Sequence, residues 1–335
     1  MRVLLTGGSG SVGKAVVDRL VSKGYSVLVI GRRVGMEFDG AEYRSCDIND
    51  YPRLREVIRG CELVVHLAAI PNPAVGTPEQ VFDVNCTGTF NVFQAAAEEG
   101  IRRIIQASSI NATGQYFGVK PAPLHYLPLD EAHPVFGTDA YSFSKHVIEE
   151  IGEFFWHREG ISSLAYRLPF VAPVSYRENM PASRERIQRV VGGLLEQSPE
   201  ERLAWFERSW KAFNQFRAGK PYETPGMARQ RMSEMPEDLR SGVSIMGSRV
   251  NFFTMLDERD SAQAIDKGLS ADFEGAHTLF VNDSHNWTGV DSKTLVDLFY
   301  PDVKVIKKDL VGTETVISID KARQMIGFEP EFSFA

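Results

Sequence analysis

The chain has 335 residues, 43% hydrophobic and 24% charged, with a formal net charge of −7. This is an ordinary globular composition, and the length predicts two domains or one large domain with an elaboration. The acidic balance argues against a nucleic-acid partner, and no apolar run is long enough to predict a membrane span. The three cysteines form no Cys-x-x-Cys pair, which predicts free thiols in a reducing cytoplasm. A strand predicted from the second residue leaves no room for a targeting peptide, which also favours the cytoplasm.

The first part of the chain alternates between strand-like and helix-like segments. Continuous apolar runs, typical of strands buried on both faces of a parallel sheet, are Arg2–Thr6, Ser26–Ile30, Leu63–Leu67, Ile104–Ala107 and Ser163–Arg167. Helical patterns between them are Gly13–Lys23, Pro52–Arg59, Val81–Glu99 and Tyr141–His157. The alternation predicts an α/β fold with a Rossmann-like doubly wound parallel sheet, which binds ligands at the carboxyl ends of its strands.

After Arg167 the alternation of strands and helices ends. Residues 176–250 are rich in charge and are predicted to be mostly helical. A helix starting near Pro199 carries an apolar stripe, which predicts packing rather than substrate contact, at Leu203, Phe206, Trp210 and Phe213. Trp205 and Trp210 border either a substrate cleft or a partner subunit. Short strands are predicted at Val303–Ile306 and Val316–Ile319. We expect a dinucleotide-binding domain from residues 1–172 and 249–282, and a smaller, mostly helical substrate-binding or capping region from residues 173–248 and 283–335.

A glycine-rich loop lies between the first predicted strand and the first predicted helix, with the sequence Thr6-Gly7-Gly8-Ser9-Gly10-Ser11-Val12-Gly13. Gly7 allows the tight turn, Gly10 lets the backbone approach a pyrophosphate, and Gly13 lets the helix pack closely on the strand. The helix start, with Ser11 and Val12, offers free N–H groups to phosphates. The loop therefore predicts a dinucleotide site.

The spacing TGxxGxxG resembles the short-chain dehydrogenase/reductase superfamily, in particular its extended epimerase/dehydratase branch. The resemblance covers roughly residues 1–175 and 249–330 and is weak across residues 176–248. It implies cofactor contacts by Asp47, Ile48, Leu67, Ala68, Ala69, Asn85, Tyr141, Lys145 and Leu168.

The end of the second predicted strand bears on the choice of dinucleotide. An acidic residue there would hold the ribose hydroxyls of NAD, but this chain has Gly31 followed by Arg32 and Arg33. The guanidinium fork of arginine suits a 2′-phosphate, although the two residues can also be a solvated turn. We therefore expect NADP or NAD, with NADP favoured.

Tyr141 and Lys145 form a Tyr-x-x-x-Lys motif whose spacing places both side chains on one face of a predicted helix. A phenol has a pKa of about 10, so a base working near neutrality needs roughly 4 kcal/mol of help. An ammonium about 4 Å away supplies on the order of 4 kcal/mol at an effective dielectric of 20. We predict Tyr141 as the proton carrier and Lys145 as its activating cation. The second copy, at Tyr300 and Lys304, contains a proline and is rejected.

By its resemblance to the family, Ser109 is the serine that hydrogen-bonds the reacting oxygen, with the adjacent Ser108 as the alternative. Tyr141 then takes the hydroxyl proton as hydride leaves for the nicotinamide, or returns it in the reverse direction. Dehydratases of this branch carry acidic residues where this chain has Ile110 and Asn111, so that type of dehydration is disfavoured.

These features predict an NAD(P)-dependent oxidoreductase or epimerase acting on a secondary alcohol or ketone of a sugar-like substrate. Nucleotide-sugar enzymes of the branch that this chain resembles usually carry an asparagine near Phe170 and a Tyr-Gly pair near Ala172. Both are absent here, which argues against a nucleotide sugar. A nucleotide-sugar 4-epimerase nevertheless remains an alternative, as does an NADP-binding sensor without turnover. The retained Tyr141 and Lys145 disfavour the sensor, because such proteins typically lose that pair.

The remaining expectations concern metals and assembly. The seven histidines form no metal-binding motif, so no metal is expected, and His66 is predicted to be a core residue. The resemblance implies a homodimer formed through the helices that contain Asn85 and Tyr141.

Overall fold

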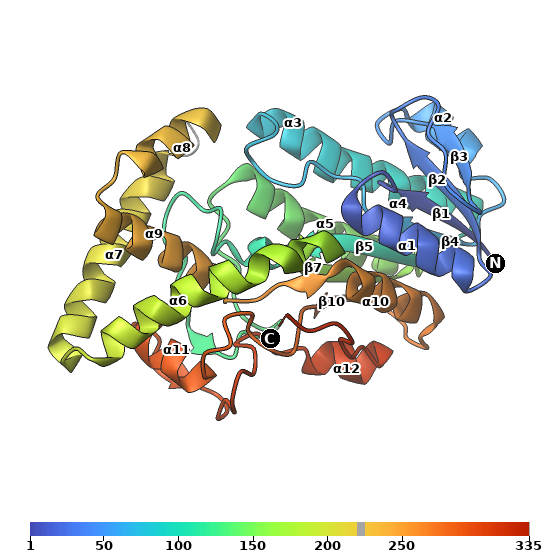
Figure 1. The fold of residues 1–335 in the computed structure, drawn as a ribbon. Coiled ribbons are helices and arrows are strands. Elements are labelled where there is room, and N and C mark those ends of the chain that lie inside the picture. The colour runs from blue at the N-terminus through green and yellow to red at the C-terminus, as the bar shows by residue number, and fades with distance from the viewer. Residues whose placement is uncertain (220–224, 335) are drawn as a thin grey trace.

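The computed structural model describes residues 1–219 and 225–334. Its centre is a parallel sheet of seven strands in the order β10-β7-β5-β4-β1-β2-β3 (Figure 1). These strands are β1 (Arg2–Thr6), β2 (Ser26–Gly31), β3 (Glu42–Ser45), β4 (Leu63–His66), β5 (Arg103–Ser109), β7 (Ser162–Leu168) and β10 (Ala276–Phe280). The strand order reverses between β1 and β4, and in such sheets ligands bind beside the carboxyl ends of these strands. The predicted doubly wound α/β fold is confirmed.

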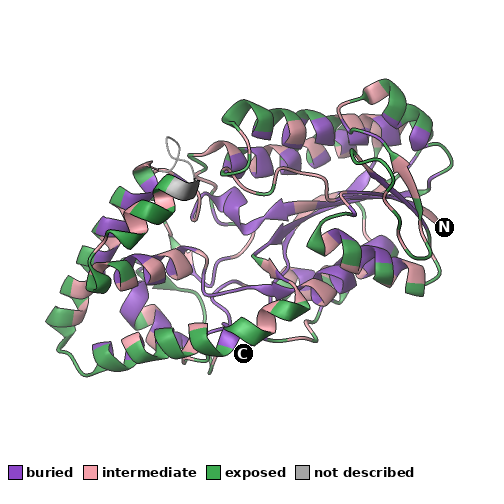
Figure 2. Ribbon diagram, turned by 45° about the horizontal axis from the view of Figure 1, so that its top comes forward, coloured by how far each residue is buried: buried purple, intermediate pink, exposed green. Residues whose placement is uncertain are grey.

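Helices cover both faces of the sheet. They are α1 (Ser11–Ser22), α2 (Tyr51–Val57), α3 (Pro78–Phe82), α4 (Gly88–Glu99), α5 (Ala140–Glu159), α10 (Glu258–Ser270) and α12 (Asp320–Ile326). Val3 and Leu5 of β1 pack with α1, α10 and α12, whereas Leu4 between them packs with α2, α4 and α5. Burial on both faces explains the continuous apolar runs of the strands, which form the buried centre in Figure 2.

A second region, mostly helical, packs beside the sheet and has a core of its own. It contains α6 (Met180–Leu195), α7 (Pro199–Gly219), α8 (Pro225–Ser233), α9 (Glu237–Val250), α11 (Ser292–Phe299) and the 3-10 turn η3 (Val174–Asn179). Two strand pairs link the parts, β6 (Tyr126–Leu127) with β11 (Val305–Ile306) and β8 (Val171–Ala172) with β9 (Leu256–Asp257). The prediction that residues 176–250 are mostly helical is thus confirmed for the described residues.

The apolar stripe of α7 is internal, with one exception. The indole of Trp210 stacks on Phe206 and Phe213 at ring-centroid distances of 6.3 and 5.7 Å. Trp205 packs toward Phe299 at 6.1 Å, so both tryptophans belong to the core of the helical region. Leu203 departs from the prediction, because it lies at the solvent side and is 47% exposed.

Three sequence-based expectations need correction. The helix predicted over Val81–Glu99 starts at Pro78 and is interrupted by a π-helical turn, η1 (Asp83–Thr87). The strand predicted at Val316–Ile319 is a single bridge between Ile317 and Leu129. The strand predicted at Val303–Ile306 shortens to β11, whose two residues are exposed.

Within the described residues, no helix combines the length and apolar character needed to cross a membrane. Cys46, Cys61 and Cys86 are buried free thiols. Burial raises the pKa of the Cys46 thiol to about 11, so this side chain stays protonated at neutral pH. The cytoplasmic location stays a prediction.

Candidate active site

The glycine-rich loop joins β1 to α1 at the point where the strand order reverses. Gly7 has φ +77°, and a Cβ added there would lie 2.6 Å from the backbone nitrogen of Ala68. A Cβ on Gly13 would lie 2.4 Å from the carbonyl oxygen of Gly7, so both positions require glycine for packing. Gly10 differs, because the nearest atom to its added Cβ is 3.6 Å away.

The N-terminus of α1 is free to bind an anion. Gly10 is its N-cap, no side chain caps it, and no acidic residue lies in its first turn. The N–H groups near Ser11 and Val12 therefore keep their partial positive charge for an external ligand. A side chain at Gly10 would occupy the space through which a phosphate reaches them, so this loop fits the pyrophosphate of a dinucleotide.

Three side chains converge at the carboxyl end of β5 and the start of α5. Ser109 ends β5, while Tyr141 and Lys145 lie one turn apart on α5, and all three are at most 6% exposed. The Ser109 hydroxyl hydrogen-bonds the phenol of Tyr141. The Lys145 ammonium donates to the carbonyl of Ala107 at 2.7 Å and lies 5.8 Å from the centre of the Tyr141 ring.

Burial sets the charges of this group. It raises the pKa of Tyr141 to about 12, against the lowering effect of the Ser109 hydrogen bond. It also lowers the pKa of Lys145 to about 8. The phenol is therefore neutral in the structure, and its activation as a base needs additional positive charge beyond what the protein supplies here.

Asn111 fixes the direction of the Ser109 hydroxyl. Its backbone N–H and its side-chain amide donate to Ser109 Oγ at 3.1 and 3.2 Å. With two donors on its oxygen, Ser109 directs its own hydrogen away from Asn111, toward Tyr141 and the adjoining cavity. The hydroxyl is thus oriented as a donor to an oxygen bound beside Tyr141.

The π-helical turn η1 places Asn85 at the junction of three elements. Its side-chain oxygen accepts from the N–H of Ile70 at 2.7 Å, and its amide donates to Ser144 Oγ at 2.9 Å. Ser144 precedes Lys145, so Asn85 ties the segment after β4 to the part of α5 that contains Tyr141 and Lys145. His66, at the end of β4, lies between two threonine hydroxyls, and burial lowers its pKa to about 3. This is the satisfied core histidine that the sequence predicts.

A cavity of about 1,390 Å³ opens over these groups. Among the predicted residues, it is lined by Val12, Leu67, Ala69, Ser108, Ser109, Tyr141, Lys145 and Leu168. Arg32 and Arg33 are exposed after β2, while Asp47 is exposed and Ile48 is buried after β3. These four lie outside the cavity lining, at the end of the neighbouring strands.

Sequence reasoning missed most of the other residues that line the cavity. Phe117 packs edge-on against Tyr141 at a ring-centroid distance of 5.4 Å, and Trp287 and Met255 line the same cavity. Arg186 of α6 and Arg240 of α9 also line it. These residues come from loops and helices without a motif, and only their meeting in space identifies them. Within the described residues, no group of three potential metal ligands is present.

Comparison with known proteins places the chain in a family. Residues 3–205 match the model of the NAD dependent epimerase/dehydratase family. The chain is 30% identical over 196 residues to an L-arabinose 1-dehydrogenase (NAD(P)(+)) of Haloferax volcanii, covering 57% of this chain and 75% of the relative. It is 27% identical over 171 residues to a uronate dehydrogenase of Pseudomonas putida, covering 50% of this chain and 60% of the relative.

Solved structures show the same fold. A UDP-glucose 4-epimerase with UDP-glucose from Thermotoga maritima superposes with a TM-score of 0.61 at 18% identity, over 99% of this chain and 94% of that chain. MoeE5 in complex with UDP-glucuronic acid and NAD gives 0.60 at 16% identity, over 99% and 95%. The structural likeness therefore continues through the helical region, beyond residue 205, where the match to the family model ends. The chain belongs to the NAD dependent epimerase/dehydratase family, the extended branch of the short-chain dehydrogenases/reductases, and is an NAD(P)-dependent enzyme of that type.

Proposed function

We propose that this protein oxidises or reduces a secondary carbinol of a carbohydrate-like substrate, using NAD(P) and the proton carrier Tyr141. The observation that carries the proposal is the convergence of Ser109, Tyr141 and Lys145 on one wall of a large cavity beside the glycine loop. The sugar dehydrogenases and sugar-nucleotide epimerases among the relatives support a carbohydrate-like substrate.

Ser109, Tyr141 and Lys145 have separate roles in the proposed reaction. When bound, the nicotinamide supplies the acceptor or donor of hydride. Ser109 donates a hydrogen bond to the reacting oxygen and stabilises the charge that develops on it. Tyr141 takes the hydroxyl proton at its phenolic oxygen during oxidation and returns it during reduction. The ammonium of Lys145 favours the phenolate, and we propose that it also holds the nicotinamide ribose.

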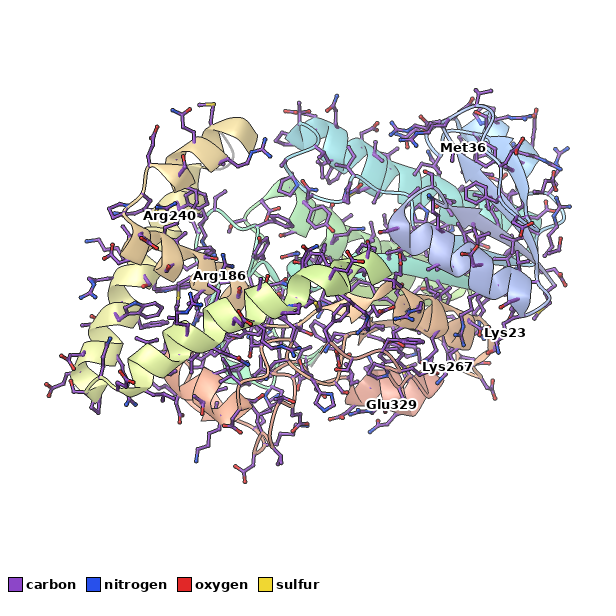
Figure 3. The ribbon with its side chains drawn as sticks, viewed as in Figure 1. Lys23, Met36, Arg186, Arg240, Lys267 and Glu329 are labelled. Atoms are coloured by element: carbon purple, nitrogen blue, oxygen red, sulfur yellow. The ribbon has the colours of Figure 1, made fainter. Side chains whose placement is uncertain are left out.

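The helical region supports an anionic group on the substrate. Arg186 and Arg240 face the cavity from α6 and α9, and neither guanidinium forms a hydrogen bond or ion pair within the described part of the chain. Figure 3 shows both at the helical end of the molecule, far from Lys23. A carboxylate or phosphate bound there would satisfy both guanidinium groups.

We favour NADP as the cofactor. Arg32 and Arg33 stand at the end of β2, where a carboxylate would repel a 2′-phosphate, and both are exposed. Asp47 and Ile48 would border the adenine. Gly31 itself faces the hydroxyl of Tyr43, which donates to the carbonyl oxygens of Gly31 and Arg33 and so fixes the turn.

We propose a dinucleotide-binding domain, residues 1–172 and 249–282, and a substrate region, residues 173–248 and 283–335, of which α12 packs on the sheet. We also propose a homodimer. Its support is a band of exposed phenylalanines on the outer face of α3, α4 and α5, 39–49% exposed, in which Phe82 stacks with Phe143 and Phe90 with Phe154. Sedimentation of the wild type against Phe154→Ser tests this assembly.

The test is hydride transfer, followed by nicotinamide absorbance with aldoses, uronates and UDP-sugars. We expect turnover that falls about 10²–10⁴-fold in Tyr141→Phe while dinucleotide affinity is kept. Net NAD(P)H formation indicates a dehydrogenase, whereas a tightly retained cofactor and an epimerised product indicate an epimerase. Dinucleotide binding without turnover, unchanged by Tyr141→Phe, would favour the sensor.

A further inference from the structure

A buried carboxylate lies one helical turn beyond Lys145, on the same face of α5. Glu149 accepts two hydrogen bonds from Arg167 of β7, at 3.0 Å from Nε and 2.8 Å from Nη2. It accepts a third, at 2.6 Å, from the hydroxyl of Ser108 on β5. Its side chain is 6% exposed and that of Arg167 is 5% exposed, so this is an internal ion pair.

The bonds of Glu149 join the elements that carry the active site. Ser108 immediately precedes Ser109, and its hydroxyl also lies 3.3 Å from the carbonyl oxygen of Lys145. The Lys145 ammonium in turn donates to Ala107 on the same strand. Glu149 therefore connects α5 to the end of β5. Its bond to Ser108 holds the residue before Ser109 against the helix that contains Tyr141 and Lys145.

Other charged groups lie near the Glu149 carboxylate, around a second cavity of about 500 Å³ that Glu149 also lines. His146 Nδ1 of α5 lies 4.0 Å away, and Lys321 of α12 and Glu131, from the segment after β6, line the same cavity. Burial alone would raise the pKa of Glu149, but His146, Arg167 and Ser108 outweigh it and hold that pKa below its usual value. The carboxylate is thus ionised at neutral pH.

We propose that Glu149 is a positioning residue for the reaction, which fixes the end of β5 against α5 and keeps the Lys145 ammonium charged. This inference rests on the proposed function of Tyr141 and Lys145. A buried ammonium loses hydration and needs a nearby negative charge to remain protonated. Burial lowers the pKa of Lys145, and Cys86 of η1 and Glu149 act in the opposite direction. Burial also raises the pKa of Cys86 to about 12 and lowers that of His66, at the end of β4, to about 3. Of Cys86, His66 and Glu149, Glu149 is therefore the one that is charged at neutral pH.

The experiment compares Glu149→Gln with Glu150→Gln in the full-length protein. The first substitution keeps the shape of the side chain and an oxygen that accepts from Ser108, but it removes the charge. Glu150 is adjacent on α5, its side chain is 62% exposed, and its substitution changes the net charge equally. NADPH affinity, read by nucleotide fluorescence from pH 6 to 10, reports the charge of Lys145 without a known substrate.

We expect the alkaline loss of NADPH affinity and of kcat to move to lower pH by about one unit in Glu149→Gln. Glu150→Gln should follow the wild-type profile. Coincident profiles for Glu149→Gln and Glu150→Gln would overturn the inference. Absence of hydride transfer in the wild type would instead overturn the proposed function, while the fluorescence profile still reports on Glu149.

A double variant separates positioning from simple stability. Removing both charges, as in Glu149→Leu with Arg167→Met, often leaves stability unchanged, because neither partner stays buried and unpaired. We expect its melting temperature to return toward wild type while kcat remains reduced. Recovery of kcat together with the melting temperature would mean that the ion pair acts only in folding.

Discussion

In the candidate site, the sheet region and the helical region hold two sets of polar side chains in opposite ways. At the carboxyl ends of β4 and β5, side chains such as Asn85 and Ser109 are buried and tied by short hydrogen bonds to several elements. On the helical wall, the side chains of Arg186 and Arg240 are exposed and unbonded within the described residues. Preorganised groups suit a step that recurs in every turnover, whereas free side chains suit recognition of one particular substrate.

We propose from this contrast that the sheet region carries the chemistry and the helical region the selectivity for substrate. It predicts that substitutions in the sheet region change cofactor affinity or kcat. Substitutions in the helical region should change KM alone.

The glycine loop offers the largest effects and a matched pair. Gly7→Ala places a Cβ against Ala68 at positive φ and should cost about 1–3 kcal/mol of unfolding free energy. In Gly10→Ala the added Cβ makes only an ordinary van der Waals contact, 3.6 Å from the carbonyl oxygen of Gly7, so stability should change by less than about 0.5 kcal/mol, while NAD(P)H affinity falls at least about tenfold. Thermal unfolding and fluorescence titration check both. Wild-type affinity in Gly10→Ala would show that phosphates do not approach this loop.

The arginines after β2 test the choice of dinucleotide. Replacing Arg32 and Arg33 together by serine should weaken NADPH binding about tenfold or more, because charge-assisted hydrogen bonds to a 2′-phosphate are lost. NADH affinity should stay unchanged. Lys23→Ser combined with Lys293→Ser removes two charges from exposed side chains elsewhere and is the control for net charge. Equal losses for both dinucleotides would show that the two arginines do not read the 2′-phosphate.

The cavity-facing arginines test the helical region. In Arg186→Ala and Arg240→Ala, KM for an anionic sugar substrate should rise about tenfold at constant kcat. KM for a neutral sugar should not change, and steady-state kinetics on a matched uronate and aldose would show the difference. A loss of kcat instead would place these residues in the chemistry and break the division between the regions.

The last expected effect concerns how the unfolding free energy depends on pH. The pKa of Lys145 is about 8 in the folded chain, below its ordinary 10.5, so the unfolded chain binds more protons between these values. The ammonium therefore costs stability below pH 8, and the cost fades as pH rises toward 10.5. Lys145→Met should raise unfolding free energy by on the order of 1–3 kcal/mol at pH 7 and less at pH 10. Equal gains at both pH values would contradict this.

The sequence predicted the sheet region well, because buried parallel strands leave continuous apolar runs and the Gly7–Gly13 loop has its own spacing. It missed β3 and β10, whose residues are mostly half-buried or exposed and carry no such run. It placed Tyr141 and Lys145 by helix periodicity. It could not place Phe117, Arg240 or Trp287 at one cavity, because their meeting depends on how the helices pack. Glu149 shares the helix face of Tyr141 and Lys145 by its spacing. Its partners Ser108 and Arg167 lie on two strands, β5 and β7, so their contact with it depends on the tertiary fold.

The π-helical turn η1 has a consequence for how this enzyme could diverge. A π turn contains one residue more than the α-helical turn it replaces, so deletion of a single residue there would yield a regular helix. The following α4 would keep its packing, while Asn85 would rotate out of reach of Ile70 and Ser144. A one-codon deletion would thus separate the segment after β4 from α5 while the sheet and its helices stay in place.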